Sequence, residues 1–184
     1  MLNQKAARIK LILMDVDGVL TDGRLYHVPV IENGVRRMAE FKGFDSQDGI
    51  GLQWCAKFGI RTGVISGRES EATTERARQC KMSYVRQGHT EKIPILEEIV
   101  ADAGVALDEV AYIGDDLTDI VVMRRVGLAC AVANARPEVK AAADFVTKVP
   151  GGNGAVREVI EFILGTQGLW QKVLEHYEAV EKNG

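Results

Sequence analysis

The hydrophobic positions of the chain fall into short apolar runs that alternate with amphipathic segments. Residues 9–14 are apolar except for Lys10, and comparable runs recur at 61–65, 110–113 and 128–132. Apolar runs of this length, bounded by glycine and acidic residues, are typical of strands buried on both faces of a parallel sheet. Four such runs predict the core of an α/β fold.

Between these runs, apolar residues recur at helical spacing. Residues 50–58 predict a helix that ends at Gly59. Thr90 is the expected N-cap of a later helix. The same pattern predicts further helices over 69–80, 93–103, 117–126, 137–143 and 155–164, and short strands over 83–85 and 144–147. Strands and helices that alternate in this way predict a doubly wound, Rossmann-like parallel sheet with right-handed crossovers.

One segment departs from the alternation. Residues 24–30 and 35–41 are rich in branched and aromatic residues, and the stretch between them, 31–34, ends in Asn-Gly. Asn-Gly between two such runs is a strong hairpin signal. Pro29 suits an exposed strand edge. We therefore expect a β-hairpin insert over 24–42, which either covers the end of the first strand or pairs with another chain.

Length and composition limit the class of protein. A chain of 184 residues with 46% hydrophobic and 27% charged residues is typical of one soluble globular domain. The net charge of -3 argues against nucleic acid as the main partner. No apolar run is long enough for a signal peptide or a membrane span, so no membrane partner is expected.

The cysteines point to the compartment. Cys55, Cys80 and Cys130 are odd in number and widely spaced, in helical or apolar surroundings. This arrangement indicates neither a disulfide framework nor a zinc site. A reducing, cytoplasmic location fits best.

The C-terminal residues continue the helical pattern. Leu169, Trp170 and Tyr177 belong to a stripe that is typical of packing, although Trp170 could instead reach the active site of a neighbouring subunit. We predict one domain over 1–168 and a C-terminal helix or tail over 169–184.

Carboxylates lie at the ends of two of the predicted core strands. Asp15 and Asp17 follow the first strand, and Asp115 comes shortly after the strand at 110–113. Residues two apart in a strand share a side, and the carboxyl ends of central parallel strands meet at one edge of the sheet. Gathered carboxylates repel each other unless a cation or a shared proton offsets the charge, and a hard divalent metal ion is the simplest offset. An ordinary Asp-Gly turn is the structural alternative.

The same residues could break a phosphate ester. Asp15 is the candidate nucleophile for in-line attack on phosphorus. Asp17 could protonate the leaving alkoxide and then deprotonate water. Mg²⁺ between Asp15 and Asp115 would reduce the repulsion between carboxylate and phosphate. Ser66 offers a hydroxyl donor and Lys92 a cation, although alone these could be a turn residue and a solvated lysine.

Four motifs together resemble those of the haloacid dehalogenase superfamily of phosphatases. They are Asp15-Val16-Asp17-Gly18-Val19-Leu20-Thr21-Asp22-Gly23, Ser66-Gly67-Arg68, Lys92, and Gly114-Asp115-Asp116 followed by Asp119. The resemblance implies that Asp15 is the nucleophile and Asp17 the acid/base. It implies that Mg²⁺ is bound by Asp15, the backbone carbonyl of Asp17 and Asp115. Asp116 and Asp119 would be supporting residues.

Within that superfamily the chain is most similar to a branch without a cap domain, typified by the 3-deoxy-D-manno-octulosonate 8-phosphate phosphatases. The similarity extends over residues 8–164 and includes the hairpin in place of a cap. It implies the haloacid dehalogenase fold, a role in lipopolysaccharide biosynthesis, and a homotetramer with shared active sites. The residues implied to contact the sugar phosphate are Asp17, Asp45, Ser46, Gln47, Asp48, Gly49, Arg68, Arg76 and Lys92.

Some positions depart from that branch. Gln47 and Gln53 stand where arginine is usual, and Asn153 replaces an arginine after Gly-Gly. Each change would remove a bidentate partner for a sugar-acid carboxylate. Related phosphatases of nine-carbon, sialic-acid-type 9-phosphates tend to carry Glu where this chain has Arg68. The expected substrate is 3-deoxy-D-manno-octulosonate 8-phosphate. A nine-carbon 9-phosphate and a non-catalytic role are the alternatives.

Overall fold

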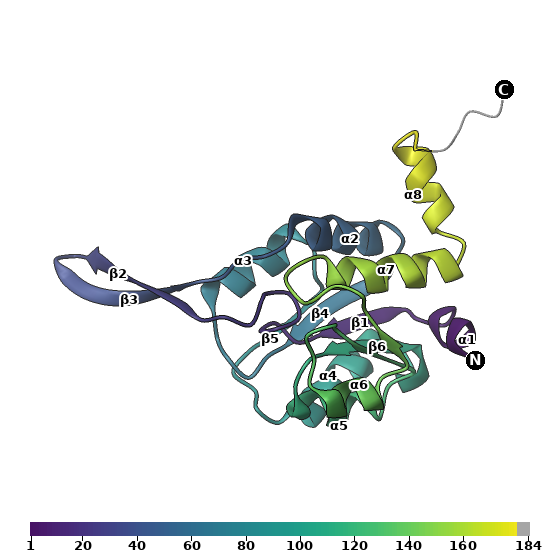
Figure 1. Ribbon diagram of the computed structural model, residues 1–184, viewed down its shortest axis with the longest axis horizontal. Helices are drawn as coiled ribbons and strands as arrows, with labels where there is room; N and C mark the ends of the chain where they lie inside the picture. The colour runs from purple at the N-terminus through teal and green to yellow at the C-terminus, as the bar shows by residue number, and fades with distance from the viewer. Residues whose placement is uncertain (180–184) are drawn as a thin grey trace.

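A six-stranded, fully parallel sheet forms the centre of the protein, as the computed structural model of residues 1–179 shows (Figure 1). The strand order is β5-β4-β1-β6-β7-β8. The strands are β1 (Leu11–Met14), β4 (Arg61–Ile65), β5 (Tyr84–Arg86), β6 (Val110–Gly114), β7 (Leu128–Ala131) and β8 (Phe145–Val146). The predicted doubly wound α/β sheet is confirmed.

Helices cover both faces of the sheet, with α2, α3 and α7 on one face and α4, α5 and α6 on the other (Figure 1). Their bounds are α2 (Ser46–Lys57), α3 (Glu71–Gln79), α4 (Lys92–Ala103), α5 (Ile120–Met123), α6 (Pro137–Ala142) and α7 (Ala155–Thr166). A short helix α1 (Leu2–Ala6), which the pattern did not indicate, precedes β1. No helix within residues 1–179 combines the length and apolarity needed to cross a membrane.

Three helical segments differ from the prediction. The helix expected over 50–58 already begins at Ser46, because the side chain of Asp45 accepts the backbone N–H groups of the first turn. Glu91 rather than Thr90 precedes α4, and its side chain makes no capping bond. The segment predicted as one helix over 117–126 is a 3₁₀ turn followed by the short α5.

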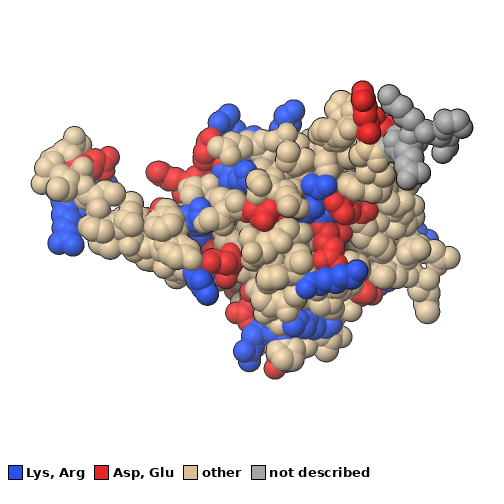
Figure 2. All heavy atoms as spheres, turned by 45° about the horizontal axis from the view of Figure 1, so that its top comes forward, with Lys and Arg blue, Asp and Glu red and all other residues tan. Residues whose placement is uncertain are grey.

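The predicted hairpin is a two-stranded antiparallel ribbon of β2 (Tyr26–Glu32) and β3 (Val35–Phe41), which projects from the body (Figure 1). Asn33 and Gly34 form its two-residue turn with φ of 50° and 77°, the left-handed conformation that such turns require. Most of the surface of the ribbon belongs to uncharged residues (Figure 2). The ribbon lies in the connection between β1 and α2, after the loop over 15–25 that follows β1.

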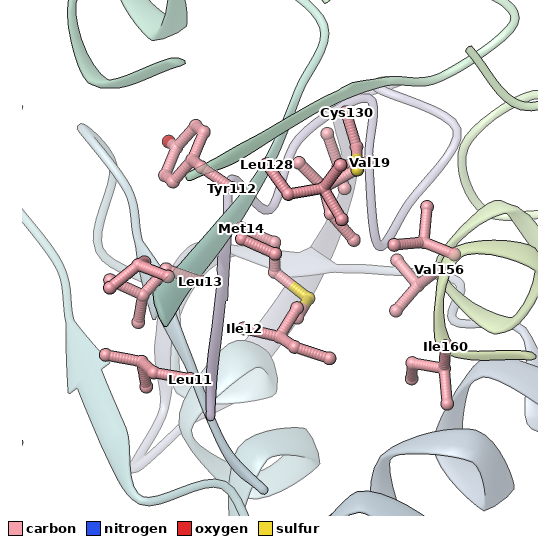
Figure 3. Packing of buried hydrophobic residues seen from close by; sticks show 14 of the residues in the cluster. Leu11, Ile12, Leu13, Met14, Val19, Tyr112, Leu128, Cys130, Val156 and Ile160 are labelled. Carbon is pink, nitrogen blue, oxygen red and sulfur yellow. The ribbon is translucent and has the colours of Figure 1, made fainter. Parts of the chain in front are cut away.

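The core holds β1 rigidly. All four residues of β1 are buried. Leu11 and Leu13 point to one face of the sheet, while Ile12 points to the face that α7 covers with Val156 (Figure 3). Burying each such side chain contributes about 1.5–3 kcal/mol. The carboxyl end of β1, where the candidate site begins, is therefore firmly placed.

The tail continues from α7 into α8 (Trp170–His176), which packs on the domain. The Trp170 ring contacts Trp54 edge to face, with ring centroids 5.4 Å apart. The Arg157 guanidinium lies 3.9 Å from the Trp54 centroid and 5.6 Å from that of Trp170. The aromatic stripe is thus a packing surface within the chain. Residues 180–184 of the predicted tail lie outside the described residues, and the domain boundary at 168 stays a prediction.

Candidate active site

The carboxyl ends of three neighbouring strands form one cavity. β1 pairs with β4 on one side and with β6 on the other, so the loops that follow these strands lie together. The cavity measures about 230 Å³ and is lined by Asp15, Asp17, Ser66, Gly67, Arg68, Thr90, Lys92, Asp115, Asp116 and Thr118. The structure thus brings together the predicted catalytic and metal-binding side chains, whose chemical roles stay predictions. Thr90 and Thr118, which also line the cavity, were not predicted as site residues.

Three carboxylates gather at the floor of this cavity. Asp15, Asp115 and Asp119 each offer an oxygen atom within 4.8 Å of the others. Asp119 is fully buried, and its Oδ1 accepts hydrogen bonds from Lys92 and Tyr112. Its Oδ2 accepts from two backbone N–H groups of the loop that follows β6. Because both of its oxygens already have partners, Asp119 holds Lys92, Tyr112 and the loop after β6 in place. Its supporting role stays a prediction.

Asp115 contributes an oxygen atom to this cluster that is free to bind a ligand. Its Oδ1 is buried and has no hydrogen-bond partner among residues 1–179. A Cβ atom on Gly18 would lie 2.1 Å from its Oδ2, and Gly18 has a φ of 91°, so only glycine allows this approach. Burial, helped by the carboxylates of Asp119 and Asp15, raises the pKa of Asp115 to about 7. A partnerless buried oxygen beside Asp15 fits a hard cation such as Mg²⁺.

Lys92 compensates part of the negative charge. Its Nζ atom lies 3.1 Å from Asp15 Oδ1 and 2.7 Å from Asp119 Oδ1. Burial lowers the pKa of Lys92, but the carboxylates of Asp119 and Asp15 outweigh this effect and raise the pKa above its usual value. Burial raises the pKa of Asp15 to about 6, against the lowering effect of Lys92. Lys92 therefore stays charged and orients the Asp15 carboxylate.

Asp17 faces a different pair of cations. Lys42, directly after β3, donates to Asp17 Oδ1, and Arg68 Nε lies 3.5 Å from Asp17 Oδ2. Both cations also contact Glu40, at 3.4 Å from Lys42 and 2.5 Å from Arg68. Partial burial raises the pKa of Glu40, but the hydrogen bond from Arg68 and the charge of Lys42 outweigh this effect and lower the pKa below its usual value. Lys42 and Glu40 were not predicted as site residues, and their place at the base of the ribbon is the one signal in the sequence that points to them.

Ser66 closes the side of the cavity formed by the loop after β4. Its Oγ accepts the backbone N–H of Arg68 at 3.2 Å, which holds the loop in a tight turn. The residue is only 3% exposed, yet it lines the cavity. Its hydroxyl hydrogen is therefore available to an oxygen atom of a bound anion.

The predicted substrate contacts at the start of α2 lie apart from this cavity. A larger cavity of about 850 Å³ is lined by Asp22, Arg24, Tyr26, Phe41, Gly43, Phe44, Asp45, Ser46, Asn134, Pro150, Gly151, Gly152 and Asn153. Asp45 and Ser46 belong to it, whereas Gln47 is exposed at the surface. One loop after β1 lines both cavities, with Asp15 and Asp17 near its start and Asp22 at its end.

The first turn of α2 is held in place by contacts of Asp48, Gly49 and Arg76. Asp48 is buried and accepts the backbone N–H of Arg157 at 2.7 Å. Burial raises the pKa of Asp48 to about 6. Arg76 donates to the carbonyl oxygen of Asp45 at 2.6 Å, and a Cβ atom on Gly49 would lie 2.3 Å from its guanidinium. Their predicted contact with substrate stays a prediction.

The three departures from the octulosonate pattern have separate positions. Gln53 donates to the carbonyl oxygen of Gln79 at 3.2 Å on the exposed side of α2. Asn153 donates to the carbonyl oxygen of Gly151 at 3.0 Å and lines the larger cavity. Of the three, Asn153 is therefore the side chain placed to affect a ligand in that cavity.

A family of known proteins and a relative with a named activity both match this chain. The sequence matches the haloacid dehalogenase-like hydrolases over residues 64–160. It is 38% identical over 164 residues to the 3-deoxy-D-manno-octulosonate 8-phosphate phosphatase KdsC of Escherichia coli K12, covering 89% of this chain and 84% of that protein.

Two solved structures have the same fold over most of their length. A probable YrbI family phosphatase from Pseudomonas syringae pv. phaseolica superimposes with a TM-score of 0.88 at 41% identity, covering 96% of this chain and 97% of that one. The 3-deoxy-D-manno-octulosonate 8-phosphate phosphatase of Moraxella catarrhalis, solved with a magnesium ion, a phosphate ion and KDO, gives 0.87 at 38% identity, covering 96% and 97%. The chain therefore belongs to the haloacid dehalogenase-like hydrolases and is similar to the octulosonate 8-phosphate phosphatases among them.

Proposed function

We propose that the chain is a Mg²⁺-dependent phosphomonoesterase that converts 3-deoxy-D-manno-octulosonate 8-phosphate to the free sugar acid and phosphate. The observation that carries this proposal is the partnerless buried oxygen of Asp115 beside Asp15 and Asp119. Asp17 and Lys92 line the same cavity. The substrate is supported by the relatives, one of which is named for this reaction and another of which was solved with KDO.

In the proposed reaction, an oxygen of Asp15 attacks phosphorus in line with the ester bond. As the bond between phosphorus and the sugar oxygen breaks, Asp17 gives its proton to the leaving alkoxide. The aspartyl phosphate on Asp15 is then hydrolysed by a water molecule whose proton goes to Asp17. The second step restores both residues.

Asp15, the backbone carbonyl of Asp17 and Asp115 are the proposed Mg²⁺ ligands. When bound, the ion would reduce the repulsion between the Asp15 carboxylate and the phosphate dianion. Lys92 and the Ser66 hydroxyl would donate to the phosphate oxygens. Asp116 accepts the backbone N–H of Leu117 at 2.7 Å and so begins the turn that carries Asp119.

The sugar-acid part is proposed to be recognised by the start of α2 and its surroundings. The cavity of about 850 Å³ that Asp45, Ser46 and Asn153 line falls in the size range of ligand pockets. Arg68 lines the smaller cavity and is half exposed, so its guanidinium can also meet a substrate carboxylate. Gln47, Asp48, Gly49 and Arg76 complete the proposed set.

The substrate can be ranked by a panel of phosphomonoesters. We expect kcat/KM for the octulosonate 8-phosphate to exceed that for nine-carbon 9-phosphates and simple sugar phosphates by at least about tenfold, because one well-placed contact changes specificity by about 10–200-fold. Phosphate release at fixed Mg²⁺ measures this ranking. A higher value for a nine-carbon ester would reassign the substrate, and no release from any ester would favour a non-catalytic role.

The assembly is proposed to be a homotetramer in which the ribbons pair and neighbouring subunits complete each active site. Exposed apolar side chains lie on both faces of the ribbon and just before it: Leu25, Val28, Val30, Ile31, Val35, Met38 and Phe41. A lone two-stranded ribbon is marginally stable in water, and clustered exposed apolar residues mark interaction sites. We propose that the ribbons of further copies of this chain cover these apolar side chains.

A double variant on one face of the ribbon tests the assembly. Met38 pairs with Pro29, and Ile31 lies two residues further along the same face. Ile31→Lys/Met38→Lys would place two charges in the proposed interface, so we expect the assembly to dissociate into smaller species in analytical ultracentrifugation. Val121→Lys, which replaces an exposed apolar residue on α5, is the matched control. An unchanged mass for the double variant would contradict the proposal.

A cytoplasmic location is also part of the proposal. Cys55, Cys80 and Cys130 are buried and free in the structure. Burial raises the pKa of each of these thiols, so they are poor thiolates. Buried, unreactive thiols are consistent with a reducing compartment.

A further inference from the structure

Four charged side chains form a closed ring where the ribbon meets the active site. Lys42 contacts Asp17, Asp17 contacts Arg68, Arg68 contacts Glu40, and Glu40 contacts Lys42. Glu40 is near the end of β3 and Lys42 directly follows that strand, whereas Asp17 and Arg68 come from the loops after β1 and β4. The base of the ribbon therefore supplies two of the four charges of the ring.

The two cations of the ring differ in burial. The Lys42 side chain is 2% exposed, and the Arg68 side chain is 46% exposed. Water and salt screen the exposed cation, so its pull on Asp17 is weak. A charge held away from water acts more strongly on its partner. Lys42 is thus the group that fixes the Asp17 carboxylate.

Other partners of Asp17 do not fix it equally well. Among residues 1–179, Lys42 gives the Asp17 carboxylate a hydrogen bond, while Arg68 contacts it only at 3.5 Å. Arg68 is held more closely by Glu40, at 2.5 Å. Without Lys42, the Asp17 side chain would keep one long contact to a half-exposed guanidinium that it shares with Glu40.

We propose that Lys42 is a positioning residue that holds the Asp17 carboxyl group toward the leaving-group oxygen. This inference rests on the proposed function, in which the proton on Asp17 moves to the alkoxide oxygen while the bond from that oxygen to phosphorus breaks. A general acid must lie within about 2.6–3.2 Å of its target. A displacement of about 1 Å can cost on the order of 10²-fold in rate.

Leaving groups of different basicity test the role of Lys42. A sugar alkoxide needs a proton to leave, whereas p-nitrophenolate leaves without one. With Lys42→Met we expect kcat/KM, which reports the steps up to departure of the leaving group and not the later hydrolysis that also uses Asp17, to fall by about 10–100-fold for the sugar phosphate and by less than about threefold for p-nitrophenyl phosphate. Asp17→Asn should show the same asymmetry. Lys57→Met, which changes an exposed lysine on α2, should leave both rates unchanged.

A structure of the variant provides a second, independent measurement. In crystals of Lys42→Met with Mg²⁺ we expect the Asp17 carboxylate to be displaced or to occupy more than one position. Equal losses with both esters, or an Asp17 side chain that keeps its single position, would overturn the proposal. The crystallographic result needs no turnover, so it decides the role of Lys42 even if the wild type hydrolyses neither ester. That kinetic result would refute only the proposed function.

Discussion

Asp15→Asn is expected to lower kcat by on the order of 10⁴-fold or more, because an amide cannot form the phosphorylated intermediate. The substitution keeps the shape of the side chain, so substrate binding should change little. Phosphate release at saturating substrate measures the loss. Asp108→Asn changes an exposed aspartate that precedes β6, at the opposite edge of the sheet, and should retain activity within about twofold. Activity within tenfold of wild type in Asp15→Asn would contradict the mechanism.

The same substitution should not unfold the protein. Burial already raises the pKa of Asp15 to about 6, so the folded state favours a neutral group at this position. Lys92 keeps its 2.7 Å contact with Asp119 in the variant, so no cation is left unpaired. We therefore expect a Tm equal to or above that of the wild type, measured by circular dichroism. A large fall in Tm would mean that lost activity reflects unfolding.

Removal of divalent metal ions is expected to abolish turnover, and added Mg²⁺ should restore it. Without a cation, the Asp15 carboxylate must approach a phosphate dianion across a cavity that already holds Asp115 and Asp119. Coulomb repulsion at such distances is several kcal/mol in a partly buried site. Activity measured before and after treatment with a chelator, and then with Mg²⁺ in excess, tests this expectation. Undiminished activity in the chelator would reject metal dependence.

The metal should also stabilise the fold in a pH-dependent way. Burial, Asp119 and Asp15 raise the pKa of Asp115 from 3.8 to about 7. In metal-free protein, this group therefore holds a proton in the folded state that the unfolded chain has released, and its contribution to the free energy of unfolding falls as pH rises from about 4 to 7. Mg²⁺ binds the ionised form. The rise in Tm caused by Mg²⁺ should thus be larger at pH 8 than at pH 6.

Asp115→Asn provides the control for this titration. The amide cannot release a proton and is a weaker ligand for Mg²⁺, so the variant should show a smaller rise in Tm that varies less with pH. Equal rises in wild type and variant would place the ion elsewhere. Equal rises at both pH values in the wild type would mean that Asp115 does not titrate in this range.

The strand ends were predictable from the sequence because the signals are local. The apolar run of β1 ends directly at Asp15, and the run of β6 ends one residue before Asp115. Parallel strands place such residues at one edge, whatever the length of the connections between them. The arrangement of Asp15, Asp17, Ser66, Lys92 and Asp115 around one cavity follows from this rule.

The contacts that form where the ribbon returns to the body of the protein were not predictable from the sequence. Lys42 is 25 residues from Asp17 in the sequence, and only the return of the ribbon brings them together. Its position among Glu and Phe residues reads as an ordinary exposed strand end. The start of α2 was misjudged for a related reason, because the polar residues after Asp45 look like a turn although they cap and begin a helix.

The packing of α8 also determines what tryptophan fluorescence can report. Trp54 and Trp170 are the only two tryptophans of the chain, and both lie where α8 packs against α2, close to the Arg157 guanidinium. Detachment of the C-terminal helix should therefore change the surroundings, and so the emission, of both tryptophans. A fluorescence titration thus monitors this helix in particular.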